Sequence, residues 1–140
     1  MNGLLHAHSG LRWVVLILLL ASIITGFLSA SKNKPYKKGL YAATMGFLHI
    51  QVILGIVVLI TRYFPLETPM GEIMKNPDAR FIIVEHPAMM LIAAIIATVG
   101  FSLGKRAQTD AKKHKNTAVM YAIALLVILV AIPWDVNRLF

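Results

Sequence analysis

The side chains best suited to chemistry in this sequence are histidines that lie in or beside long apolar runs. His6 and His8 stand near the N-terminus, His49 lies inside the second apolar run, and His86 lies near the start of the third. An ionisable side chain in such a run usually faces the interior of a helix bundle and marks a functional site. Neutral imidazole binds metal ions and haem iron. The fifth histidine, His114, belongs to the polar run KKHK, and we expect it to be solvated.

Other kinds of chemistry are less well represented. The chain has no cysteine, which excludes disulfides, iron–sulfur clusters and haem attached through thioethers. A metal ion would have to be bound by histidine, methionine, carboxylate or backbone atoms. The sequence has no nucleophile–base pair, phosphate-binding loop or zinc-protease helix, so we expect no independent catalytic activity.

The elements that must position the histidines are four apolar helices. Hydrophobic residues make up 58% of the 140 residues and charged residues 14%, and the mean hydropathy is +0.72. A membrane span needs about 20 apolar residues, and four runs meet this length, at residues 11–30, 40–63, 81–103 and 117–134. The links between the first and last pairs are short, which favours antiparallel neighbours. The sequence therefore predicts one domain over residues 1–140, an all-α integral membrane protein with an up-down bundle of four transmembrane helices.

The distribution of charge predicts how the bundle is oriented. The links at residues 31–39 and 104–116 hold nine Lys and Arg residues and only one acidic residue, Asp110, whereas the remainder of the chain has five of each kind, including Asp135 and Arg138. Cytoplasmic loops carry the excess of Lys and Arg. We therefore expect both links in the cytoplasm and both termini on the outer, periplasmic side of a bacterial inner membrane. The net charge of +8 is thus a topology signal, and nucleic acid is not an expected partner. The middle loop, residues 64–80, has room for a short helix around residues 71–75.

Helical spacing places small residues on the same helix face as two of the histidines. The first stripe comprises His8, Arg12, Val15 or Leu16, Leu19, Ser22 and Gly26, and the second comprises His86, Met90, Ala93, Ala97, Gly100 and Gly104. Small residues let helices pack closely and also leave room for a flat cofactor. On the second run, Gly46 precedes His49 on one face.

Depth along the helices selects one pair of histidines. With a rise of about 1.5 Å per residue, His8 lies about 33 Å, His86 about 27 Å and His49 about 15 Å from the cytoplasmic ends. Haem b between two helices needs two imidazoles at similar depth, so His8 and His86 are the best pair of iron ligands. Arg12, one turn after His8, is placed to pair with a haem propionate. His49 is an alternative ligand if the ring is tilted or a second site exists.

Two other interpretations of the same residues stay open. His6 and His8, with Glu85, His86, Met89, Met90 and Asp135, all lie toward the outer side and suit an outer-face copper or zinc site. The histidines are alternatively hydrogen-bonded between the helices of a non-catalytic accessory subunit, which packs on a larger respiratory complex. Glu85 is expected to pair with Arg12 or Arg80, or to carry protons.

Five segments carry a resemblance to a known family: LHAHSGLRW, LHIQVILGI, VEHPAMMLIA, KRAQTDAKKHK and YAIALLVILVAIPW. The chain resembles, over nearly its whole length, short bacterial four-helix membrane proteins loosely labelled cytochrome b. The resemblance implies a b-type haem protein of the respiratory membrane, with His8, His49 and His86 as the positions to carry over and His6 within the matching motif. We expect other subunits of a membrane redox complex as partners. A quinone is a further partner that we leave open, since the sequence has no diagnostic quinone motif.

Overall fold

The structure is a computed structural model and describes residues 2–134; Asp135 and Arg138 lie outside the described residues. The long helices are α1 (Asn2–Ser31), α2 (Gly39–Val58), α5 (His86–Arg106) and α6 (Asp110–Ala131). Two π-helical turns, η1 (Leu59–Tyr63) and η2 (Phe81–Glu85), extend α2 and precede α5. The prediction of four helices long and apolar enough to cross a membrane is confirmed.

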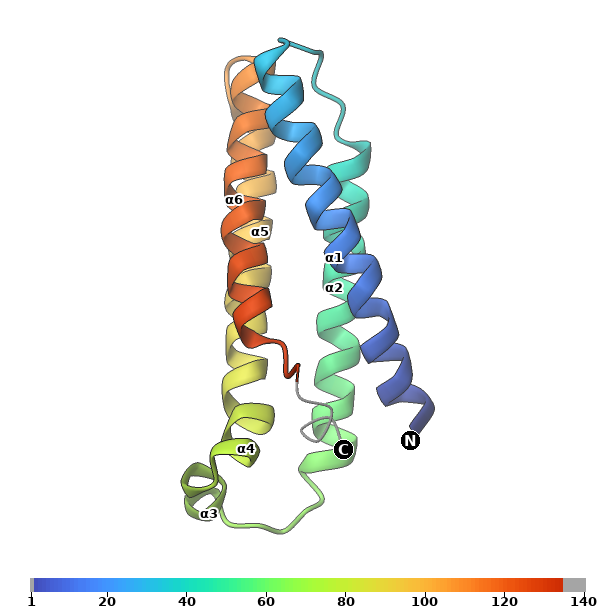
Figure 1. The fold of residues 1–140 in the computed structure, drawn as a ribbon, viewed down its shortest axis with the longest axis vertical. Helices are drawn as coiled ribbons and strands as arrows, with labels where there is room; N and C mark the ends of the chain where they lie inside the picture. The colour runs from blue at the N-terminus through green and yellow to red at the C-terminus, as the bar shows by residue number, and fades with distance from the viewer. Residues whose placement is uncertain (1, 135–140) are drawn as a thin grey trace.

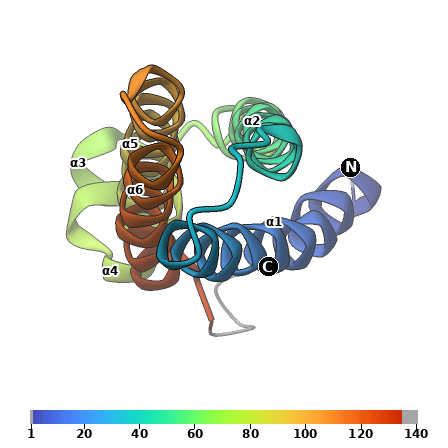
Figure 2. The same cartoon turned by 90° about the horizontal axis from the view of Figure 1, so that it is seen from above.

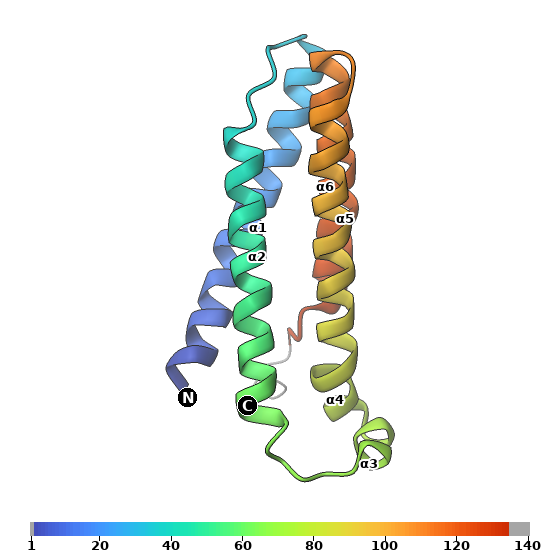
Figure 3. The same cartoon turned by 180° about the vertical axis from the view of Figure 1, so that it is seen from behind.

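The four long helices run up and down along one axis, and consecutive long helices are antiparallel neighbours (Figures 1 and 3). The links at residues 32–38 and 107–109 lie together at one end, here called the link end. The start of α1 and the end of α6 lie at the opposite end, here called the open end. Figure 2 shows α1 crossing at an incline, so that its C-terminal half lies beside α6 and its N-terminal half diverges from it.

Small residues hold the helices close together away from the open end. A Cβ placed on Gly26 of α1 would lie 2.7 Å from the Cβ of Ala118 on α6, and one placed on Gly100 of α5 would collide with Met120. Each glycine therefore permits a contact that a larger residue would prevent. Between α1 and α2, the hydroxyls of Ser22 and Thr44 are 2.8 Å apart and buried, which satisfies two polar groups inside the bundle.

A buried hydrogen-bonded cluster closes the link end. The Tyr41 hydroxyl lies 2.6 Å from Nδ1 of His114, whose Nε2 lies 3.2 Å from the carbonyl oxygen of Pro35. The Tyr121 hydroxyl donates to the carbonyl oxygen of Tyr41 at 2.8 Å. The prediction that His114 is solvated is therefore wrong: its side chain is 3% exposed. The sequence signal was misleading because Lys112 and Lys115 are exposed while the one histidine of KKHK faces α2.

The middle loop carries two short helices, α3 (Met70–Lys75) and α4 (Pro77–Arg80). The first confirms the helix expected around residues 71–75. The second is capped by Asn76, whose side chain accepts hydrogen bonds from the backbone N–H groups of Asp78 and Ala79. Pro77 at the first helical position needs no hydrogen-bond acceptor and favours the same start. α4 leads directly into η2 and fixes where the third long helix begins.

Candidate cofactor pocket

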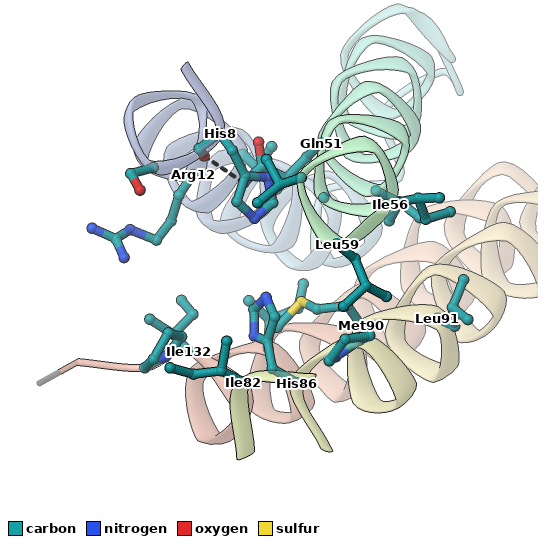
Figure 4. Close-up of a pocket in the computed structure, with 18 of the residues that line it drawn as sticks. His8, Arg12, Gln51, Ile56, Leu59, Ile82, His86, Met90, Leu91 and Ile132 are labelled. Atoms are coloured by element: carbon teal, nitrogen blue, oxygen red, sulfur yellow. Dashed lines mark hydrogen bonds between the residues drawn. The ribbon is translucent and has the colours of Figure 1, made fainter. Parts of the chain in front are cut away.

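A pocket lies at the open end among α1, α2, η1, η2, α5 and the residues that follow α6 (Figure 4). The space between its lining atoms is about 1220 Å³ when the open mouth is included. Its walls are mostly aliphatic, with contributions such as Val52, Ile56, Leu91 and Ile132. The polar side chains that reach it include His8, Arg12, Gln51 and His86.

The π-helical turns shape two walls of the pocket. Each turn has a backbone hydrogen bond that spans five residues. In η1 the N–H of Phe64 donates to the carbonyl of Leu59, and in η2 the N–H of His86 donates to the carbonyl of Phe81. Pro87 explains the second, because proline lacks the N–H that an α-helix needs and its ring crowds the preceding turn. Such turns are frequent at functional sites. Here they widen the helices where they border the pocket.

His86 is held by the end of α6. Its Nδ1 lies 2.7 Å from the carbonyl oxygen of Ala131, the last residue of α6. This carbonyl lacks a helical partner because α6 ends two residues before Pro133. A carbonyl only accepts, so Nδ1 carries the proton, and the lone pair of the neutral ring is on Nε2. That is the tautomer a metal-ligating histidine needs, and the hydrogen bond also fixes the direction of the ring.

His8 is held by α2. Its ring packs on Gly55, where a Cβ would lie only 2.9 Å from Cε1 of the imidazole. One helical turn before Gly55 on α2, the side-chain N–H of Gln51 donates to the backbone carbonyl of His8 at 2.7 Å. Nδ1 of His8 and Oε1 of Gln51 are buried and have no hydrogen-bond partner among residues 2–134. Buried polar atoms without partners are uncommon in proteins, so the pocket has unused capacity to bind a ligand.

The rings of His8 and His86 face one another across the pocket. Their centres are 6.3 Å apart and their planes make an angle of 84°, and Figure 4 shows both side chains directed into the same space, with Met90 beside them. A metal–imidazole bond of about 2.0–2.1 Å, with the ring centre roughly 1 Å beyond the nitrogen, puts two imidazoles on opposite sides of one ion about 6 Å apart. The observed separation therefore matches that of two axial ligands.

Arg12 lies beside the pocket, and no carboxylate of residues 2–134 forms an ion pair with it. Its Nε is buried and makes no hydrogen bond within the described part of the chain. Its guanidinium carbon lies 5.1 Å from the ring centre of Trp13 and 5.9 Å from that of Trp134. The ion pair that the structure does contain in residues 2–134 joins Arg80 and Glu85 at 2.8 Å, which is one of the two pairings expected for Glu85. The place of Arg12 in the pocket wall makes it a candidate partner for an anionic group bound there.

Among the other candidate ligands in residues 2–134, Met90 lines this pocket, whereas His6, His49, Glu85 and Met89 do not. His49 is exposed on α2 and its Nε2 lies 3.1 Å from the hydroxyl of Thr98 on α5. His6 is exposed, and neither it nor Met89 lines the pocket. Within residues 2–134 no group of three or more His, Asp or Glu residues is placed to hold a metal ion. Asp135, which was part of the copper or zinc interpretation, lies outside the described residues.

Sequence reasoning missed three residues that position the histidines, namely Gln51, Gly55 and Ala131. Pro133 was a usable signal for Ala131, because a helix that ends before a proline leaves free carbonyl groups. Gly55 and Gln51 had no comparable signal, since their role depends on which face of α2 meets α1. No protein-family model, curated protein or solved structure matches this chain.

Proposed function

We propose that this chain is a multi-pass membrane protein that binds haem b between α1 and α5 and transfers electrons, with His8 and His86 as the two axial iron ligands. The observation that carries the proposal is the pair of imidazole rings, whose centres are 6.3 Å apart in a mainly aliphatic pocket. The absence of cysteine means that the haem would be held without thioether bonds.

The polar groups of the pocket fit the parts of a haem. The Nε2 lone pair of His86 is directed by the hydrogen bond to Ala131, and a buried nitrogen of His8 lacks a partner. Arg12 would pair with a propionate, because a guanidinium binds a carboxylate through charge-assisted hydrogen bonds. Aliphatic walls exclude water from the remainder of the ring.

Two histidine ligands also favour one kind of chemistry. His8 and His86 would hold the haem from both sides, and the chemistry that a haem held in this way would supply is one-electron transfer. The chain's own residues then act by holding the ring and setting its potential. We infer a role in respiratory electron transfer, alone or as a subunit of a larger redox complex.

The proposed orientation follows from the link end. That end carries the nine Lys and Arg residues of the ranges 31–39 and 104–116, and positively charged loops remain in the cytoplasm. The open end would then face the outside of a bacterial inner membrane, which puts the cofactor near the outer surface. Exposed aliphatic side chains on all four long helices suit a lipid environment.

The proposal is tested by the haem content of the purified protein. The chain is expressed in a haem-competent host, purified in detergent and assayed by pyridine haemochrome; we expect about one haem b per chain. A haem-free protein that co-purifies with an oxidase or reductase would instead support the accessory-subunit interpretation. Bound copper or zinc without haem would support the outer-face metal site.

A further inference from the structure

A second, shallow groove lies at the link end between α1 and α6, at the opposite end of the bundle from the cofactor pocket. Gly26 of α1 and Ala118 of α6 pack closely beside it, because a Cβ on Gly26 would lie 2.7 Å from that of Ala118. The end of α1 and the first two turns of α6 contribute the lining, which consists of Phe27, Ala30, Ser31, Ala111, Lys112 and Lys115.

The groove is basic on its α6 side. Lys112 and Lys115 are exposed, and residues three apart on a helix are neighbours with about 5–6 Å between their Cβ atoms. Neither lysine forms an ion pair within residues 2–134. Asp110 also lies on α6, but separations of two and five residues direct its side chain to another face of the helix. Neighbouring like charges on a helix repel, so an anion bound between the two lysines would stabilise this end of α6.

The α1 side of the groove is apolar and continues into the exposed apolar surface of the bundle. Phe27 lines the groove and is 44% exposed. Helical spacing places further exposed residues on the faces of Phe27 and Lys115, toward the centre of the bundle. These are Leu20 and Ile24 on α1 and Val119 and Ile123 on α6. The groove thus joins two cations to an apolar surface, which suits a ligand with an anionic end and long apolar chains.

We propose that this groove binds one anionic phospholipid, with its phosphate between Lys112 and Lys115 and an acyl chain along the apolar residues beside Phe27. The proposed orientation puts the link end at the cytoplasmic surface, where basic pockets between membrane helices bind anionic headgroups. None of the lining residues, all within residues 2–134, is acidic, so the groove has no carboxylate for the ammonium of a zwitterionic headgroup. The inference rests on the proposed membrane location and is independent of haem.

The test is native mass spectrometry of the full-length protein in mild detergent, titrated with dioleoyl phosphatidylglycerol or dioleoyl phosphatidylethanolamine. The two lipids have the same acyl chains, so a difference between them reports on the headgroup. We expect one phosphatidylglycerol per chain to bind in a saturable way and phosphatidylethanolamine to bind more weakly. Inorganic phosphate in large excess should not displace the lipid, because it lacks the acyl chains. Bound lipid is counted without haem, so this test and the haem assay can fail separately.

Two variants and a matched control sharpen the test. Replacing both groove lysines, Lys112→Gln with Lys115→Gln, should weaken phosphatidylglycerol binding about 25-fold, since each lysine near an anionic lipid contributes about five-fold. Ala30→Leu narrows the groove without a change of charge and should also weaken binding. The control is Lys37→Gln with Lys38→Gln, which removes the same charge from exposed positions at the link end that do not line the groove. It should keep the parent affinity.

Three results would overturn the proposal. Equal binding of the two lipids would show that the groove does not recognise an anionic headgroup. Equal losses in the two lysine pairs would show that charge spread over the link end attracts the lipid, without a specific site. Displacement of phosphatidylglycerol by inorganic phosphate would show that the groove binds a free anion.

Discussion

Nδ1 of His86 donates to the carbonyl oxygen of Ala131 at 2.7 Å, at the residue where α6 ends. This contact joins the end of one helix to the ring of a candidate iron ligand on another. A hydrogen bond to Nδ1 makes an imidazole a more basic ligand, and losing such a partner typically reduces metal affinity about 10–100-fold. The position at which α6 stops is therefore a determinant of the proposed site.

Pro133→Ala should weaken this contact. Without the proline, α6 is able to continue, and a backbone N–H four residues further on competes for the Ala131 carbonyl. A less basic His86 stabilises ferric iron less, so we expect a higher midpoint potential in a redox titration and a lower haem affinity. Pro65→Ala, in the exposed middle loop, is the control. An unchanged potential in Pro133→Ala, or equal changes in both variants, would contradict this role.

Gly55→Ala should disturb the haem and spare the fold. The added Cβ would lie 2.9 Å from Cε1 of His8, and the ring is the free end of a side chain that is able to move away. We expect haem binding to weaken about ten-fold or more, since overpacking typically costs about 1–3 kcal/mol. Gly46→Ala on the same helix meets open space and should keep full haem content. Haem titration of the two variants measures the difference, and equal affinities would refute the packing argument.

Gly100→Ala should destabilise the bundle itself. Its Cβ would collide with Cβ and Cγ of Met120 on α6, close to the helix backbone, where relief requires α5 and α6 to separate. We expect a loss of about 1–3 kcal/mol in unfolding free energy, measured by denaturation in mixed micelles. Gly10→Ala in α1 has no atom within 4 Å of the new Cβ, and it should be neutral or stabilising because alanine favours the helix. Similar stabilities for both variants would exclude close packing at Gly100.

The proposed orientation predicts which residues reach the outside of the cell. Because the chain has no cysteine, Lys34→Cys and Glu67→Cys each introduce a single thiol, at the link end and in the middle loop respectively. A membrane-impermeant maleimide should label Glu67→Cys in intact spheroplasts and Lys34→Cys only after permeabilisation. The reverse pattern would invert the topology, and labelling of both before permeabilisation would argue against a spanning bundle.

Much of the fold was predictable because hydrophobic length is a strong signal. The spans expected at residues 11–30, 40–63, 81–103 and 117–134 all lie in long apolar helices, although the first helix begins at Asn2 and the last ends at Ala131. The depth argument paired His8 with His86, and their rings lie 6.3 Å apart. The rise per residue of an α-helix is constant, so the position of a residue along its helix can be estimated without knowing how the helices pack.

What the sequence could not provide was the rotation of each helix about its axis. His49 was an alternative iron ligand, yet its side chain is exposed on α2, where its Nε2 lies 3.1 Å from the hydroxyl of Thr98. His114 was expected in solvent and is buried against Tyr41. Gln51 and Gly55 support His8 only because their face of α2 meets α1. Helix rotation depends on the fit of many small contacts between helices, and no single-sequence pattern encodes it.

The most direct test of the central proposal is the reduced-minus-oxidised visible spectrum of the purified protein, recorded beside His8→Ala, His86→Ala and His49→Ala. We expect a sharp low-spin b-type signal in the parent protein and in His49→Ala, whose side chain lies outside the pocket. His8→Ala and His86→Ala should each lose that signal while the protein yield is maintained. A haem spectrum that survives both substitutions, or one that is lost only in His49→Ala, would contradict the proposed ligation.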